Sequence, residues 1–285
     1  MLFCQKCTIF AAHYMKFSDI GHRIWTYIQH LLTAWNTGGE GIHSPYLFYL
    51  VRFLFYDDNT YYIYRDIEYR RSCMLHAPKT IKVEDYGTGQ HQERNVMDIA
   101  KTSLESPKVA QLLFRLILFL SHEAERPLQI AELGTSLGIT TAYLAAPSSL
   151  NLVWTFEGAH ELARLAKQNW EALGLTNIRL VEGNIDETVL AQPSNALKAV
   201  PRWDFVYIDA NHTYEATKRY VLHFMPLLHE KSIIAIDDIH YSAGMEKAWQ
   251  ELKSLPDVTT SMDLYHIGLL FFDTHYIHRH YKLRL

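Results

Sequence analysis

Residues 130–145 read IAELGTSLGITTAYLA and carry the clearest structural signal in the chain. A short apolar run ends around Glu132, a turn follows with Gly134 and Gly138, and a helix-forming run begins near Ile139. Glycines in such a turn let the backbone bend tightly and let a ligand approach closely. Free N–H groups at the start of the following helix favour an anionic group. The stretch predicts a strand–turn–helix unit whose turn is a candidate ligand site, although the same unit also occurs without any ligand.

From about residue 129 onward, short apolar runs alternate with segments of helical periodicity. The predicted strands are Gln129–Leu133, Leu152–Phe156, Ile178–Val181, Phe205–Ile208 and Ser232–Ile236. Strands that are covered on both faces are nearly continuously apolar, and this alternation is typical of a parallel sheet wrapped by helices. Two final runs, Val258–Tyr265 and Gly268–Phe272, are joined by two residues, which predicts an antiparallel hairpin. The predicted fold is α/β: a Rossmann-like, doubly wound, mostly parallel sheet with a C-terminal antiparallel hairpin.

The first part of the chain, residues 1–104, differs from residues 105–285. It is rich in aromatic residues and histidine, with helical patches at Ile20–Trp35, Pro45–Phe55 and Gln92–Ser103. No repeat and no flexible linker separates it from the rest. We therefore expect an N-terminal helical cap that packs on the sheet domain, covers its site and shapes the pocket there.

Composition excludes several classes of protein. The 285 residues are 48% hydrophobic and 20% charged, with a net charge of −4, which fits a globular chain rather than a disordered or fibrous one. The acidic balance argues against nucleic acid or an anionic membrane as partner. Three cysteines are too few for a disulfide framework, and no apolar run reaches the ~20 residues of a membrane span. We expect a cytoplasmic protein; Met15 is an alternative start, and a homodimer is compatible with the sequence.

Polar or small residues follow the other predicted strands. Glu157 ends the second strand, Gly183 and Asn184 follow the third, and Asp209 ends the fourth. A carboxylate at the second strand end can accept both protons of a ribose diol, and small residues after the third leave room for a ring. Because open α/β sheets bind ligands at the carboxyl ends of their strands, these residues predict one shared site.

The pattern acidic-x-Gly-x-x-x-Gly in ELGTSLG differs from the G-x-G-x-x-G of nicotinamide-binding folds. Together with the preceding SPKVAQLLFRLI helix, it resembles class I S-adenosylmethionine-dependent methyltransferases, above all the metal-dependent small-molecule O-methyltransferases of the catechol and caffeoyl-CoA type. The likeness covers residues 106–272, while GIHSPYLFYLV (41–51) resembles uncharacterised Bacteroidetes methyltransferase-like proteins. It implies S-adenosylmethionine as cofactor. The cofactor-binding residues that it implies are Glu132, Gly134, Thr135, Ser136, Gly138, Glu157, Gly158, Gly183, Asn184 and Asp209.

Two strand-end loops, IDANH (208–212) and IDDIH (236–240), carry the candidate chemistry. The resemblance implies that Asp209, Asp237 and Asp238 hold Mg²⁺ or Ca²⁺, for which carboxylate oxygens are suitable ligands. The family usually has asparagine at the position of Asp238, and lysine at that of His212. Since histidine titrates near neutral pH, His212 is a candidate catalytic base beside Asp209. Alternatively, these aspartates cap the neighbouring helices and bind no ion.

The predicted function is S-adenosylmethionine-dependent methyl transfer to a small-molecule acceptor, at oxygen, with a divalent cation assisting. Two alternatives stay open at this stage: a nicotinamide-dependent oxidoreductase, and a non-catalytic cofactor-binding or interaction protein. The C-x-x-C pair Cys4–Cys7 lacks the second pair that a zinc site needs. The histidine-rich end, residues 274–285, reads as a solvated tail, and DYGTGQ (85–90) as a turn.

Overall fold

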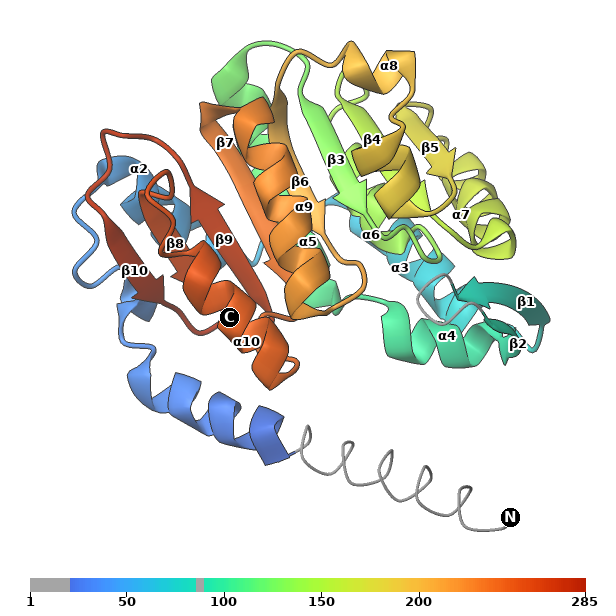
Figure 1. Cartoon of the computed structure of the whole chain (residues 1–285), viewed down its shortest axis with the longest axis horizontal. Helices are drawn as coiled ribbons and strands as arrows, with labels where there is room; N and C mark the ends of the chain where they lie inside the picture. The colour runs from blue at the N-terminus through green and yellow to red at the C-terminus, as the bar shows by residue number, and fades with distance from the viewer. Residues whose placement is uncertain (1–20, 86–89) are drawn as a thin grey trace.

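The computed structural model describes residues 21–85 and 90–285, which form an eight-stranded sheet with helices on both faces (Figure 1). Its strands are β3 (Gln129–Leu133), β4 (Leu152–Glu157), β5 (Ile178–Glu182), β6 (Trp203–Ile208), β7 (Leu228–Asp237), β8 (Thr260–Asp263), β9 (Ile267–Phe271) and β10 (Arg279–Lys282). All five predicted parallel strands are confirmed, to within a few residues at their ends. The mostly parallel α/β fold predicted from the sequence is therefore confirmed.

The strands lie in the order β10-β8-β9-β7-β6-β3-β4-β5. Strands β3 to β7 pair in parallel, whereas β9 runs antiparallel to both β7 and β8, which confirms the hairpin. The chain builds outward from β3 to β5, then returns to the other side of β3 with β6. This reversal places a topological switch point between β3 and β6, where sheets of this kind bind ligands.

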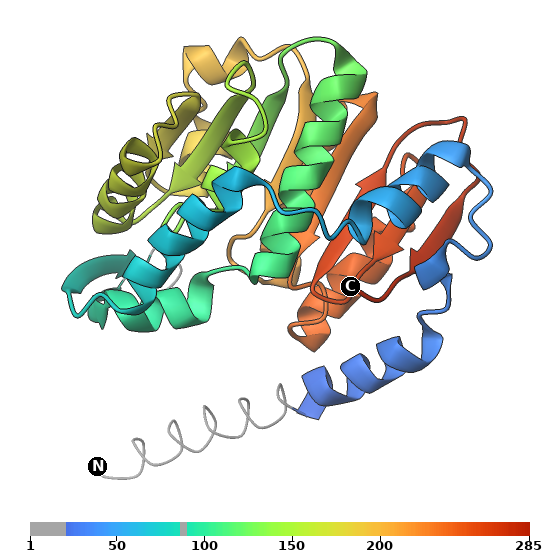
Figure 2. The same ribbon diagram turned by 180° about the vertical axis from the view of Figure 1, so that it is seen from behind.

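Two helical layers cover the sheet, as Figures 1 and 2 show from opposite sides. One layer holds α5 (Pro107–Ala124), α6 (Ile139–Ala145) and α7 (His160–Ala172); the other holds α8 (Asn195–Lys198), α9 (Tyr214–Phe224) and α10 (Ala243–Leu252). Each helix buries an apolar stripe, such as Leu113 and Leu116 of α5. Trp249 of α10 is 1% exposed and packs in the hydrophobic core.

The N-terminal segment has several elements of its own. A helix over residues 21–33 precedes η1 (Asn36–Gly38), α2 (Pro45–Tyr49), η2 (Leu50–Phe55), α3 (Tyr62–Leu75), the hairpin β1 (Thr80–Asp85) and β2 (Gln90–Asn95), and α4 (Val96–Ser103). The sequence did not predict α3, and the helix predicted over Gln92–Ser103 is wrong in its first four residues, which lie in β2.

The N-terminal segment shares a hydrophobic core with the sheet domain. Leu50 and Phe55 of η2 are buried in the same cluster as residues of α5. In addition, the buried Arg115 of α5 donates hydrogen bonds to the carbonyl oxygens of Leu54 (2.8 Å) and Phe55 (3.0 Å). These bonds satisfy backbone acceptors at the end of a helical turn, which would otherwise be costly to bury.

The prediction that residues 274–285 form a solvated tail is wrong. Residues 279–282 form β10, which extends the sheet in parallel with β8, and Tyr281 and Leu283 are buried. The alternation of inward apolar residues with polar ones, HYKL, fits an edge strand better than a free tail. The C-x-x-C pair, Met15 and residues 86–89 of the predicted turn lie outside the described residues.

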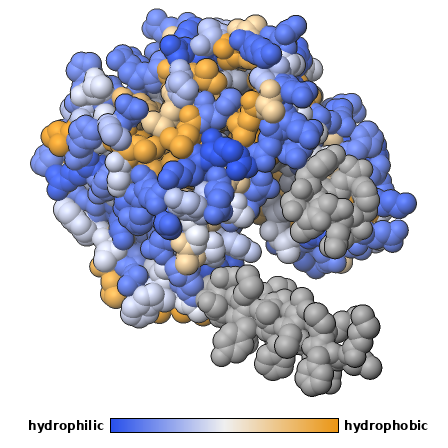
Figure 3. Space-filling view, viewed as in Figure 1, coloured by the Kyte–Doolittle hydropathy of each residue, from blue (hydrophilic) through white to orange (hydrophobic). Residues whose placement is uncertain are grey.

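Hydrophilic side chains predominate on the face seen in Figure 3, with hydrophobic ones in scattered groups. Within the part of the chain that the structure describes, no helix combines the length and the apolar character that crossing a bilayer requires.

Candidate functional site

A cavity of about 620 Å³ lies at the carboxyl ends of β3, β4, β6 and β7. The predicted site residues that line it are Gly134, Ser136, Glu157, Gly158, Asn184, Asp209, His212, Asp237 and Asp238. Their convergence follows from the parallel strands, whose carboxyl ends meet at one edge of the sheet. Four other predicted residues do not line the cavity: Glu132, Thr135, Gly138 and Gly183.

Glu132 lies behind the glycine turn, with a side chain that is fully buried. Its Oε2 accepts hydrogen bonds from the hydroxyls of Thr141 and Thr155. Burial raises the pKa of Glu132 to about 8, against the opposing effect of those two hydrogen bonds. In this arrangement Glu132 ties the end of β3 to α6 and β4, which supports the turn from beneath.

The turn after β3 closes tightly against β6. Gly134 has a φ of +99°, and a Cβ atom there would lie 2.0 Å from the carbonyl oxygen of Asp209. The backbone N–H of Ser136 donates to Oε2 of Glu157, and that of Ala159 donates to Oε1, both at 2.8 Å. The Glu157 carboxylate at the end of β4 is thereby fixed in orientation at the cavity wall.

Asp209, His212 and Asp237 form an acidic group at the ends of β6 and β7. One ligand atom from each lies within 4.8 Å of the others. Nε2 of His212 is 3.3 Å from Oδ1 of Asp209, and Oδ1 of Asp237 is buried with no hydrogen-bond partner. Asp238 lines the cavity but does not belong to this group.

The charges of this group perturb one another. Burial and the neighbouring Asp209 and Glu105 carboxylates raise the pKa of Asp237 well above its ordinary value. Burial also raises the pKa of Asp209, although the hydrogen bond with His212 opposes that shift. The pKa of His212 is raised: burial alone would lower it, but the contact with Asp209 outweighs burial. Crowded carboxyl groups of this kind favour either a shared proton or a bound cation.

Helix capping does not explain the aspartates. The side chain that caps α9 is Thr213, and the one that caps α10 is Ser242. Asp209 and Asp237 instead face the cavity, and Asp238 adopts a positive φ of 53°. The alternative that these residues serve only as caps is therefore wrong.

The N-terminal segment lines one side of the cavity. The lining residues that it contributes are Arg23, Val83, Arg94, Thr102, Ser103 and Leu104, and Glu105 follows in the loop before α5. Its position across the strand ends is visible in Figure 1, where α4 and the β1–β2 hairpin lie below the arrowheads of β3 and β4. The hydroxyls of Ser103 and Ser136 are 2.9 Å apart, which joins this segment to the glycine turn. The sequence predicted a covering segment but none of these residues, since no local motif marks them.

A family model described as a methyltransferase domain matches residues 131–239. These residues therefore form a methyltransferase domain. The matched range begins in β3 and ends just after β7, so it contains the glycine turn and every strand end that lines the cavity. This match favours the methyltransferase over the nicotinamide-dependent oxidoreductase.

Solved structures share the fold of this methyltransferase domain at low sequence identity. An O-methyltransferase from Bacillus cereus in complex with SAH is 17% identical, with a TM-score of 0.53, and the alignment covers 76% of this chain and 93% of that one. A putative caffeoyl-CoA O-methyltransferase from Staphylococcus aureus is 18% identical, with a TM-score of 0.51, covering 61% and 88%. The search of curated proteins finds no match.

Proposed function

We propose that the protein transfers a methyl group from S-adenosylmethionine to an oxygen atom of a small molecule, assisted by a divalent cation. The observation that carries this proposal is the common cavity: Glu157 and the Asp209–His212–Asp237 group line the same space of about 620 Å³. That volume is within the about 300–1,000 Å³ of small-molecule sites. A donor and an acceptor site therefore adjoin.

The donor end lies at the glycine turn. Glu157 is oriented by two backbone N–H groups and would accept hydrogen bonds from the ribose hydroxyls of the cofactor. Gly134 keeps the backbone free of a side chain where the cofactor passes, and Asn184 lines the wall beyond. The Bacillus cereus protein and TomG from Streptomyces achromogenes, whose structures contain SAH and SAM respectively, share this fold.

The acceptor end has the side chains that a cation requires. Asp237 has a buried, unpartnered oxygen, and Asp209 lies beside it, so both fit the role of carboxylate ligands. Asp238, at the rim, would add further negative charge. A bound Mg²⁺ or Ca²⁺ would hold the acceptor and make its hydroxyl more acidic.

His212 would take the proton of the acceptor. As the methyl group leaves the sulfonium for the acceptor oxygen, the hydroxyl proton must leave as well, and a neutral imidazole accepts it. The ring of His212 faces the cavity beside Asp209 and lies 6.0 Å, centroid to centroid, from Tyr241. Asp209 therefore orients His212 as well as contributing to the acidic group.

A transfer assay with isotopically labelled S-adenosylmethionine tests the proposal. The full chain is incubated with a panel of catechols, other phenols and hydroxylated acids, with Mg²⁺, with Ca²⁺, or with excess chelator. We expect labelled methyl ethers that depend on the cation and disappear in Asp209→Asn and Asp237→Asn.

Full activity in excess chelator would overturn the proposed role of the cation. Labelled products that bear N-methyl groups would overturn oxygen as the acceptor atom. Tight S-adenosylmethionine binding with no turnover on any acceptor would favour the non-catalytic alternative. Absence of S-adenosylmethionine binding in calorimetry would overturn the function as a whole.

A further inference from the structure

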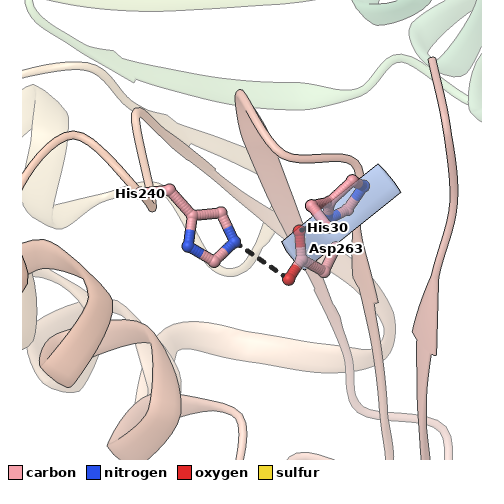
Figure 4. A group of neighbouring side chains, drawn as sticks. All are labelled: His30, His240 and Asp263. Atoms are coloured by element: carbon pink, nitrogen blue, oxygen red, sulfur yellow. Dashed lines mark hydrogen bonds and ion pairs between the residues drawn. The ribbon is translucent and has the colours of Figure 1, made fainter. Parts of the chain in front are cut away.

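We propose that His30, His240 and Asp263 form a buried zinc site, separate from the methyl-transfer cavity. One ligand atom from each residue lies within 4.8 Å of the others, and the three residues are 3%, 6% and 4% exposed. They come from the N-terminal helix, the loop after β7 and the end of β8 (Figure 4). None of the three lines the cavity.

The hydrogen bond of His30 fixes which of its ring nitrogens is free. Nε2 of His30 is 2.8 Å from the carbonyl oxygen of Leu283, an acceptor only, so Nε2 carries the proton. In a neutral ring, Nδ1 then carries a lone pair and no proton. It lies 3.3 Å from Oδ1 of Asp263, which is another hydrogen-bond acceptor. Nδ1 has no hydrogen-bond partner and is buried. Two acceptors at this distance repel unless a cation lies between them or the ring is protonated.

Burial opposes protonation of that ring. The His30 side chain is 3% exposed, and burial disfavours the charged form of an imidazole. The neutral imidazole is the form that binds a metal ion. A metal ion also suits Asp263, whose carboxylate is deeply buried and lies against both histidines.

The ligand set points to Zn²⁺. Two imidazole nitrogens and one carboxylate oxygen, with a water as fourth ligand, make one of the common zinc sets. Ligating histidines usually donate their other N–H to a backbone carbonyl or carboxylate, and the bond from His30 to Leu283 has this form. Nε2 of His240 lies 3.0 Å from Oδ2 of Asp263, so both histidines face the same carboxylate, each at a different oxygen.

A zinc ion here would join parts of the chain that are far apart in sequence. His240 is two residues beyond Asp238, in the loop that follows the acidic group, while His30 is on the helix that carries Arg23 to the cavity wall. The ion would hold the N-terminal helix against the C-terminal hairpin. Its expected role is therefore structural.

Metal content of the untagged full chain tests the site. The background for the test is Asp209→Asn, Asp237→Asn and His275→Gln, which removes ligands from the other two described groups that could bind a metal. We expect this triple variant to retain about one zinc per chain after dialysis and X-ray absorption to show two imidazole ligands. Adding His30→Gln should remove the zinc and lower the thermal midpoint.

His280→Gln, in the same background, is the matched control, because His280 lies in the neighbouring strand β10 and its side chain forms a hydrogen bond with Ser261 at 2.9 Å. It should keep the zinc. Zinc content well below one per chain in the triple variant would overturn the proposal, as would full zinc content after His30→Gln. If that variant does not fold, absorption spectra of the folded triple variant that lack two imidazole ligands would overturn it instead.

Discussion

Gly134 and Asp209 approach so closely that a single added methyl group would collide: a Cβ atom on Gly134 would lie 2.0 Å from the Asp209 carbonyl oxygen. The contact joins the glycine turn after β3 to the loop that carries the acidic group. Donor and acceptor ends of the proposed site are thus in direct backbone contact. A change on either side is expected to disturb the other.

Gly134→Ala should therefore abolish S-adenosylmethionine binding and destabilise the fold. Gly174→Ala is the matched control, because Gly174 also has a positive φ (+68°) but nothing lies within 4 Å of its Cβ position. The control should lose only the ~1–2 kcal/mol of folding stability that a non-glycine residue costs in left-handed backbone, and it should keep cofactor binding. Thermal unfolding and calorimetry measure both effects, and equal behaviour of the two variants would contradict the steric explanation.

Glu157→Ala should weaken S-adenosylmethionine binding by about 1–3 kcal/mol, or about five- to 150-fold in Kd, through lost hydrogen bonds to a charged group. Glu157→Gln should lose less, since one carbonyl oxygen remains. Glu182→Gln is the control: Glu182 also ends a strand, but it binds Lys167 and His160 away from the cavity. Unchanged calorimetric affinity in Glu157→Ala would be evidence against its role.

Asp204 should make the fold sensitive to acid. Burial would raise its pKa, but hydrogen bonds from His229, Arg126 and the backbone N–H of Gln129 outweigh burial and lower it. A lowered folded-state pKa adds stability above the unfolded value of ~3.9, and this stability is lost as the pH falls through the folded pKa. Asp204→Asn should unfold more easily at pH 7 and show a flatter loss of stability below about pH 4. Denaturant titrations from pH 7 to pH 3 measure this, and parallel curves for the two proteins would refute it.

A fragment of residues 105–285 should aggregate. Removing the N-terminal segment uncovers apolar side chains of α5 and leaves the buried guanidinium of Arg115 without the carbonyls of Leu54 and Phe55. Size-exclusion chromatography and thermal unfolding of the fragment measure this. A soluble monomer with one cooperative transition would show instead that residues 1–104 are a separable part.

The sequence predicted the features that are local. Strands β3 to β7 are continuous apolar runs, and the glycine turn is one short motif, so both can be read from neighbouring residues. Helix α3 (YIYRDIEYRRSCML) was missed because aromatic and charged residues alternate around it without a clear apolar face. Strand β10 was missed because its polar residues read as solvated.

Contacts between residues that are far apart in the sequence could not be predicted from local motifs. Glu105 reaches the acidic group from the loop between α4 and α5, and no motif marks it. His30 and Asp263 are brought together by the docking of one helix on the hairpin. Glu132 has the residue type expected of a ligand contact, but its position in the middle of the sheet face buries it.

The contact between His30 and Leu283 spans 253 residues, which matters while the protein is being made. A ribosome synthesises His30 well before Leu283, whose carbonyl oxygen holds it. At the about 5–20 residues per second of synthesis, the interval is on the order of ten to fifty seconds. During that time Arg23 has no cavity to line, and the buried face of its helix is bare. This helix is therefore synthesised long before it can dock, and a nascent chain that stalls before residue 283 carries an unprotected helix for a chaperone to hold.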